Sequence, residues 1–167
     1  LKHDTVLGNI EYLSAKEKSG FEIEELAGNA LVCSKQTALD NLVLRTRDSY
    51  LKGQLSMNYA HWADYKDFIH QVSFNSKLSK SHLQMADVAF FAPALQGIYK
   101  NLIVEGKVIG TIDNLKGKDL DINFGGFSHF SGDVSLNGLP HIDETAISIR
   151  AKTIATNYGD LRQIPIP

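Results

Sequence analysis

Alternation of apolar and polar residues is the feature that most limits what this chain can fold into. It is clearest over residues 114–139, on both sides of the glycine pair Gly125-Gly126. A period of two is typical of a β-strand with one apolar face, and glycine allows the positive φ of a tight turn. The apolar positions are Leu120, Ile122 and Phe124 before the glycines, and Phe130, Val134 and Leu136 after them. The stretch therefore predicts a β-hairpin with one apolar and one polar face.

A second hairpin with the same spacing comes earlier, so the sequence contains an internal repeat. Before the turn, Leu42-x-Leu44-x-Thr46 matches Leu120-x-Ile122-x-Phe124; after it, Ser49-x-Leu51-x-Gly53-x-Leu55-Ser56-Met57 matches Ser128-x-Phe130-x-Gly132-x-Val134-Ser135-Leu136. Chance alternation is not expected to reproduce the shared glycine and serines. The two units, about residues 39–57 and 115–139, indicate a repeat of roughly eighty residues and an elongated stack of strands rather than a closed barrel.

Shorter alternating runs predict the remaining strands. They cover residues 10–16, 21–26, 30–35, 74–78, 83–85 and 147–149. In one further strand glycines share the apolar face, which indicates a bend or a ligand close to the backbone. That face carries Leu102, Val104, Gly106, Val108, Gly110 and Ile112.

Two short helices are predicted among these strands. Over about residues 59–70, apolar and aromatic side chains recur at steps of three and four, the spacing of an amphipathic helix. Such a helix would cover the end of the sheet or pack on its apolar face; a docking surface for a partner is the alternative. The second helix spans about residues 87–95, with Asp87 as a candidate cap. Residues 156–167 are predicted to connect to a next repeat.

The length of 167 residues fits one domain or one piece of a longer protein. The chain begins without Met, and its first residues lack the basic head and apolar run of a signal peptide. We therefore expect an internal fragment whose anchor or export signal lies outside it. No stretch is apolar for long enough to span a bilayer. The net charge of −2 and the scattered Lys and Arg residues do not favour a nucleic-acid partner.

The residues that can carry chemistry form no recognisable catalytic or metal-binding pattern. The six histidines are dispersed and lack the i, i+4 spacing of a helical metal pair. The stretch from Asp119 begins like a calcium loop, but Phe124 and Phe130 stand where Gly and a bidentate Glu are required. Ser49 and Lys52 have the Ser-x-x-Lys spacing of one enzyme class without its companion motifs. We therefore predict a protein that is not an enzyme and that uses no cofactor and no metal.

Three runs of the sequence resemble one protein family. They are FAPALQG at residues 91–97, EGKVIGTIDNLK at 105–116 and FSGDVSLNGLP at 130–140. The chain resembles the translocation and assembly module B (TamB) proteins of the AsmA-like superfamily. Residues 16–59 are similar to the same proteins, so the resemblance covers nearly the whole chain.

The resemblance implies a long protein of the cell envelope of bacteria with two membranes. Members are anchored in the inner membrane and cross the periplasm, and their strands form a curled sheet, the β-taco, with an apolar concave side. They are implicated in phospholipid transport to the outer membrane and, with an outer-membrane barrel partner, in the assembly of outer-membrane proteins. The resemblance therefore also implies a role in protein secretion and outer-membrane biogenesis. For this chain the resemblance implies a periplasmic part of such a protein, without the segment that meets the barrel partner.

The sequence therefore predicts a mainly β fold: an elongated, curled antiparallel sheet with an apolar concave groove and one or two short helices. We expect a lipid-transfer conduit, in which phospholipid acyl chains lie in the groove and headgroups stay in water. The residues expected to line the groove are Leu42, Leu44, Leu55, Met57, Val104, Val108, Ile112, Leu120, Ile122, Phe124, Phe130, Val134, Leu136, Ile147 and Ile149. The alternatives are a scaffold or chaperone whose edge strand pairs with outer-membrane proteins, and a structural β-sandwich, in which the same residues form an ordinary core.

Overall fold

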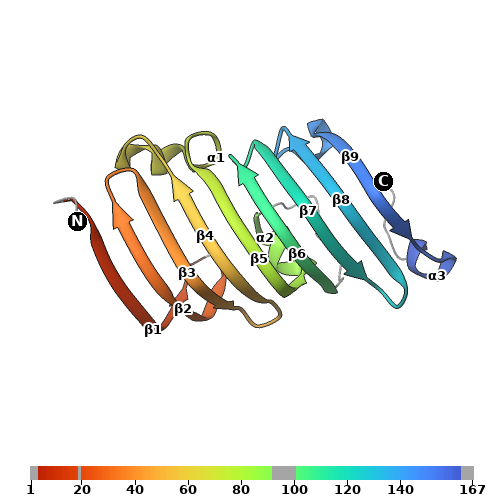
Figure 1. Ribbon diagram of the computed structural model, residues 1–167, viewed down its shortest axis with the longest axis horizontal. Helices are drawn as coiled ribbons and strands as arrows, with labels where there is room; N and C mark the ends of the chain where they lie inside the picture. Colours follow the sequence, from red (N-terminus) through yellow and green to blue (C-terminus); the bar gives the residue numbers. More distant parts are fainter. Residues whose placement is uncertain (1–3, 19, 92–100, 163–167) are drawn as a thin grey trace.

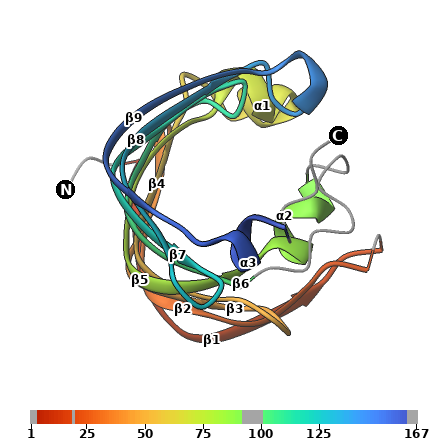
Figure 2. The same cartoon turned by 90° about the vertical axis from the view of Figure 1, so that its right-hand side faces the viewer.

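All the described strands belong to one antiparallel sheet that curls without closing. The computed structural model describes residues 4–18, 20–91 and 101–162, and its nine strands follow one another across the sheet in sequence order (Figure 1). Figure 2 shows that the sheet curls without closing on itself, with α2 and α3 on the inner side of the curl. The predicted fold class is confirmed, with several short helices where the sequence predicts one or two.

The strands are nine to twelve residues long and the helices are short. The strands are β1 (Val6–Lys16), β2 (Glu22–Cys33), β3 (Gln36–Arg45), β4 (Tyr50–Asn58), β5 (Ser73–Gln84), β6 (Asn101–Gly110), β7 (Asn114–Phe124), β8 (Ser128–Asn137) and β9 (Ala146–Ala155). The helical segments are η1 (Trp62–Asp67), α1 (Phe68–Gln71), α2 (Met85–Phe91), η3 (Ile142–Glu144) and α3 (Tyr158–Leu161).

A line of glycines crosses the sheet. Each even-numbered strand contains one glycine with a φ between +139° and +155°. These are Gly28 in β2, Gly53 in β4, Gly106 in β6 and Gly132 in β8. A Cβ on any of them would come closer than 3.0 Å to the backbone of a neighbouring strand. Only glycine adopts this conformation without strain and leaves room for that backbone.

A bulge in a neighbouring strand faces each of these glycines. Between Leu39 and Leu42, β3 contains one more residue than β4 contains between Leu55 and Gly53. β5 has the same extra residue opposite Gly106, β7 has one opposite Gly132, and β1 has one opposite Gly28. A β-bulge bends its strand and increases the local twist. Because the glycines and bulges lie in one line, neighbouring strands bend at the same level, which makes the sheet a groove.

The two hairpins share backbone details beyond their sequence pattern. Asn41 in β3 and Asp119 in β7 have positive φ angles of 53° and 47°, and no other non-glycine residue in the described ranges does. Each is followed by a buried leucine, Leu42 or Leu120. The order β3, β4, helix, β5, helix then recurs as β7, β8, helix, β9, helix. The described chain thus contains the same structural unit twice.

Two predicted strand breaks are wrong. The predicted strands over 21–26 and 30–35 merge into β2, because Gly28 is a bend glycine and not part of a turn. The predicted strands over 74–78 and 83–85 likewise merge into β5, whose alternation is interrupted by the bulge between Leu78 and Ser81. Both errors have one cause: a one-residue bulge changes the phase of the alternation without ending the strand.

The helix predicted over about 59–70 is shorter and begins later. It consists of the 3₁₀ segment η1 followed by α1, which ends at Gln71. The Asp64 carboxylate accepts the backbone N–H groups of Ala60 at 2.8 Å and His61 at 3.0 Å. These two bonds hold the preceding chain as a cap, so the helical conformation starts only at Trp62.

The second predicted helix, over about 87–95, begins earlier than expected. It starts at Met85 as α2, so Asp87 is its third residue and not its cap. Residues 92–95 lie outside the described residues. The predicted connection over 156–167 contains α3, and its residues 163–167 are also outside the described ranges.

Replacing Gly53 by alanine is expected to destabilise the fold by about 1–3 kcal/mol. Its φ of +144° is strained for an L-residue, and a Cβ would collide with the carbonyl oxygen of Lys77. Urea unfolding followed by circular dichroism measures the change. Gly8→Ala in β1 is the matched control, because a Cβ there would meet no described atom within 4 Å. Equal stability of the two variants would show that the bend does not require glycine.

Candidate functional site: the concave face of the sheet

The predicted groove residues all fall on the concave face. Ser49, at the turn before β4, donates a hydrogen bond to Asp87 of α2, and α2 lies inside the curl, so the Ser49 side chain faces the concave side. Side chains alternate along a strand, so every second residue after Ser49, up to Met57, faces the concave side too. Paired residues of antiparallel strands share a face, and the pairing extends this assignment across the sheet. The face carries Leu42 and Leu44 (β3), Leu55 and Met57 (β4), Val104 and Val108 (β6), Leu120, Ile122 and Phe124 (β7), Phe130, Val134 and Leu136 (β8), and Ile147 and Ile149 (β9). Ile112 follows β6 and lines a cavity on this side.

Burial differs along the concave face. Leu42, Val104 and Leu120, which lie close to the line of glycines, are buried. On the last strand, Ile147 and Ile149 keep 55% and 59% of their surface exposed. The same residue set is therefore packed core at the bend and open surface at the β9 edge. Contact of these residues with lipid stays a prediction.

An aromatic cluster covers one end of the concave face. The rings of Tyr65 and Phe68 lie 6.0 Å apart, and Phe68 meets Phe74 of β5 edge-on at 5.7 Å. Tyr65 donates a hydrogen bond to the Thr37 hydroxyl of β3 at 3.3 Å, and Tyr59 shares one with the same hydroxyl at 3.0 Å. Burial raises the pKa of Tyr59. The segment η1–α1 therefore packs on the apolar face, as one of the two interpretations of the predicted helix requires.

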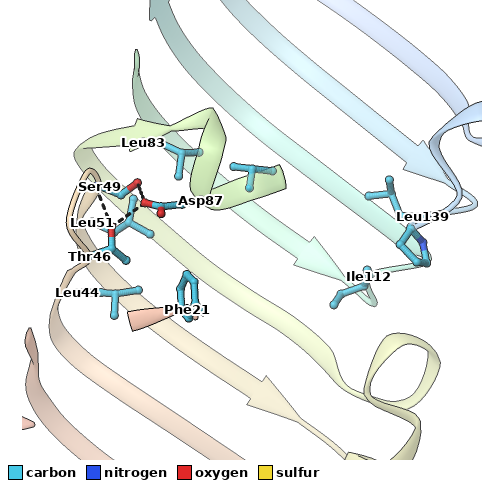
Figure 3. A pocket seen from close by; sticks show the side chains of 11 residues that line it. Phe21, Leu44, Thr46, Ser49, Leu51, Leu83, Asp87, Ile112 and Leu139 are labelled. Carbon is cyan, nitrogen blue, oxygen red and sulfur yellow. Dashed lines mark hydrogen bonds between the residues drawn. The ribbon is translucent and has the colours of Figure 1, made fainter. Parts of the chain in front are cut away.

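A carboxylate on α2 ties that helix to the sheet. Asp87 accepts hydrogen bonds from the hydroxyl groups of Thr46, at 2.6 Å, and Ser49. Thr46 and Ser49 are buried, and the Ser49 hydroxyl also accepts the backbone N–H of Gln84 at 2.9 Å. Figure 3 shows the three side chains meeting at the turn between β3 and β4. We call Thr46, Ser49 and Asp87 the Asp87 clasp.

The same device recurs at α3, one structural unit later. Asp160 accepts the hydroxyl of Ser128 at 2.7 Å and the backbone N–H groups of Phe127 at 3.1 Å and Gly126 at 3.3 Å. Ser128 matches Ser49 in the sequence repeat, and both Ser128 and Asp160 are buried. The Ser128 hydroxyl, followed by these backbone N–H groups, lowers the pKa of Asp160 although burial opposes the shift. Ser128 and Asp160 form the Asp160 clasp.

A cavity of about 280 Å³ lies between α2 and the walls of the groove. Its apolar lining is Phe21, Leu44, Leu51, Leu83, Val88, Ile112, Leu139 and Pro140, and the Asp87 clasp lies beside them (Figure 3). Sequence analysis identified Leu44 and Ile112 as groove residues and missed the others. Leu51 could have been found, because it matches Phe130 in the repeat. Val88 could not, because nothing in the local sequence places α2 inside the groove.

The convex face carries ion pairs as well as apolar residues such as Val43, Ile103 and Ile109. Lys118 pairs with Asp133 at 2.8 Å, and Lys152 pairs with Asp119 at 2.9 Å. Lys52 also faces this side, with its ammonium 4.8 Å from the ring centroid of Tyr50, so the Ser-x-x-Lys pair points to opposite faces of the sheet. Within the described ranges, no three His, Cys, Asp or Glu side chains are grouped so that they could hold a metal ion.

Acid is expected to weaken the attachment of α3. Because the pKa of Asp160 is lower in the folded chain than in the unfolded one, its carboxylate stabilises the fold above the unfolded pKa. This contribution is lost as the pH falls through the lowered, folded pKa. Urea unfolding between about pH 2 and pH 6 measures the effect, and Asp160→Asn should remove this part of the pH dependence. Parallel curves for the wild type and the variant would contradict it.

Comparison of the chain with models of protein families, with curated proteins and with solved structures finds no match. The resemblance of its sequence runs to the TamB proteins therefore stays a prediction. The geometry itself provides one curled sheet, an apolar concave face, and two helices tied into the groove by carboxylates.

Proposed function

We propose that this chain is a non-enzymatic lipid conduit, in which hydrocarbon chains lie along the concave face. The observation that carries the proposal is an apolar concave face on a sheet that stays open at both edges. On β9, three isoleucines on this face, Ile147, Ile149 and Ile154, keep more than half of their surface exposed. Exposed apolar residues gathered on one face typically mark a surface that binds something apolar.

The physical chemistry of a lipid suits such a groove. Each methylene buried away from water contributes about 0.8 kcal/mol, so an acyl chain along the floor is strongly favoured over one in water. A trough that is open on one side leaves the polar headgroup in water, which avoids the cost of burying it. Apolar contacts have no fixed direction, so a bound chain can slide from one position to the next. No catalytic group is needed.

The single sheet favours the conduit over a structural β-sandwich. A sandwich buries its apolar faces by packing two sheets about 10 Å apart. Here the described strands all belong to one sheet, and among the described residues the segment η1–α1, α2 and α3 lie on its concave side. These helices cover parts of the face and leave the isoleucines of β9 exposed.

The open β9 edge is the observation that favours the second candidate, a scaffold for outer-membrane proteins. β9 is the last strand of the described sheet and all ten of its residues are exposed, so its edge can pair with a further strand, of this protein or of another. A bulge at the level of Ala151 interrupts this edge, and bulges are a common device against edge pairing. We therefore rank edge pairing below lipid carriage.

The cellular setting of the proposal follows from the sequence resemblance to the TamB proteins. It supports a periplasmic location, as part of an inner-membrane-anchored protein that carries phospholipid towards the outer membrane. Within the described ranges, no helix combines the length and the apolar character needed to cross a membrane.

Placing a charge on the concave face is expected to lower lipid binding. Ile149→Asp puts a carboxylate where an acyl chain would lie, and we expect at least about a tenfold loss of bound phospholipid. The purified chain is incubated with vesicles of phosphatidylethanolamine and phosphatidylglycerol and re-isolated, and its lipid is extracted and measured by mass spectrometry. Ile149 is 59% exposed, so the substitution should leave the fold intact.

Ser148→Asp is the matched control. It adds the same charge one residue earlier on β9, where the side chain is exposed on the convex face. It should bind lipid as the wild type does. Wild-type protein that carries no lipid, or equal loss in both variants, would contradict the conduit.

A further inference from the structure

We propose that the cavity beneath α2 is a seat for a single hydrocarbon chain, and that the Asp87 clasp sets its width. The inference rests on the proposed lipid conduit and makes it specific. A hydrocarbon chain lying along the groove would pass between α2 and the loops that carry Ile112 and Leu139, at the opposite end of the strands.

The lining of the cavity indicates an apolar occupant. Eight of its eleven lining residues are apolar. The other three are the members of the Asp87 clasp, in which the hydroxyl groups of Thr46 and Ser49 both donate to one Asp87 oxygen, Oδ2. Because both hydroxyl groups already have an acceptor, they need no polar group from a ligand. An alkyl chain matches such a lining, whereas a sugar or a phosphate would lose its hydration without replacement bonds.

The size of the cavity indicates one chain. Its volume of about 280 Å³ lies just below the range of about 300–1,000 Å³ that is typical of small-molecule pockets. A two-chain lipid would therefore place one chain in the seat and leave the other in the open part of the groove. The far wall of the seat is formed by Ile112 and by Leu139-Pro140, beyond the strands that carry Leu44 and Leu51.

The clasp fixes the near wall. Val88 follows Asp87 directly in α2 and lines the cavity, so the bonds that hold Asp87 to Thr46 and Ser49 also place Val88. Ser49 is only 4% exposed, and without the carboxylate its buried hydroxyl would lose its acceptor. The clasp therefore ties α2 firmly to the turn and keeps the seat narrow.

The recurrence of the clasp shows that it belongs to the structural unit. In the second unit the position of Thr46 is held by Phe124, which has no hydroxyl group. There Asp160 reaches the turn amides itself, over Gly125, where a Cβ would collide with the carboxylate. Two different sets of residues thus tie a helix to the same turn of the repeat.

Filling the seat is the decisive experiment. Binding of cis-parinaric acid, a fatty acid whose fluorescence rises in apolar surroundings, is titrated with the full chain. Val88→Trp fills the cavity from α2, and Leu139→Trp fills it from the loop on the far wall. We expect each to weaken binding by about tenfold or more. Ser148→Trp, which adds the same bulk to an exposed position on the convex face of β9, is the control and should bind as the wild type does.

The clasp is tested separately. Ser49→Ala removes one donor to Asp87, and Ser49→Thr restores a hydroxyl. We expect the alanine variant to exchange the backbone amides of α2 faster and to bind the probe more weakly, and the threonine variant to recover both. Circular dichroism confirms that each variant is folded.

Each outcome decides between the two proposals. If both tryptophan variants bind the probe as the wild type does, the seat is refuted while lipid carriage elsewhere in the groove stands. If the wild type binds neither the probe nor phospholipid, the conduit itself is refuted. If Ser49→Ala leaves both exchange and affinity unchanged, the clasp does not set the width of the seat.

Discussion

The alignment of one glycine per even strand with one bulge per odd strand is the constraint on which the rest of the structure depends. Gly53 is an example: its φ of +144° is strained for any other residue, and a Cβ there would collide with the backbone of β5. A bulge on the neighbouring strand supplies the extra residue that lets the pairing continue across the bend. Since the device occurs at one level in strand after strand, the bends add up to a trough rather than cancelling.

A trough made from a single sheet has an inner face that it cannot bury by itself. In a sandwich a second sheet covers that face; here short helical segments do so in part. The aromatic rings of η1–α1 pack on one end of the face, and the two clasps hold α2 and α3 at the other. The β9 end of the face stays exposed, as Ile149 shows. The same partial cover that protects the core thus leaves apolar side chains exposed at the β9 end.

Sequence reasoning predicted the face because side-chain alternation survives in each strand segment between bulges. Leu42 and Leu44 lie on one side of a bulge and Leu39 on the other, and all three face inwards. The same bulges caused the errors, because β2 and β5 each looked like two strands. The clasps were missed because their partners are 38 and 32 residues apart, and pairing at that distance depends on the tertiary fold. Their one trace in the sequence was the serine shared by the two hairpins, Ser49 and Ser128.

The difference between the clasps tells more about the unit than their likeness does. In the first unit the Thr46 hydroxyl accepts the backbone N–H of Ser49 and donates a hydrogen bond to Asp87. With Phe124 in that place the hydroxyl is gone, and the longer turn through Gly125 lets Asp160 accept the amides directly. This second arrangement requires glycine at position 125, because a Cβ there would collide with the Asp160 carboxylate. What the two units have in common is therefore the position of a helix inside the groove rather than a particular set of bonds.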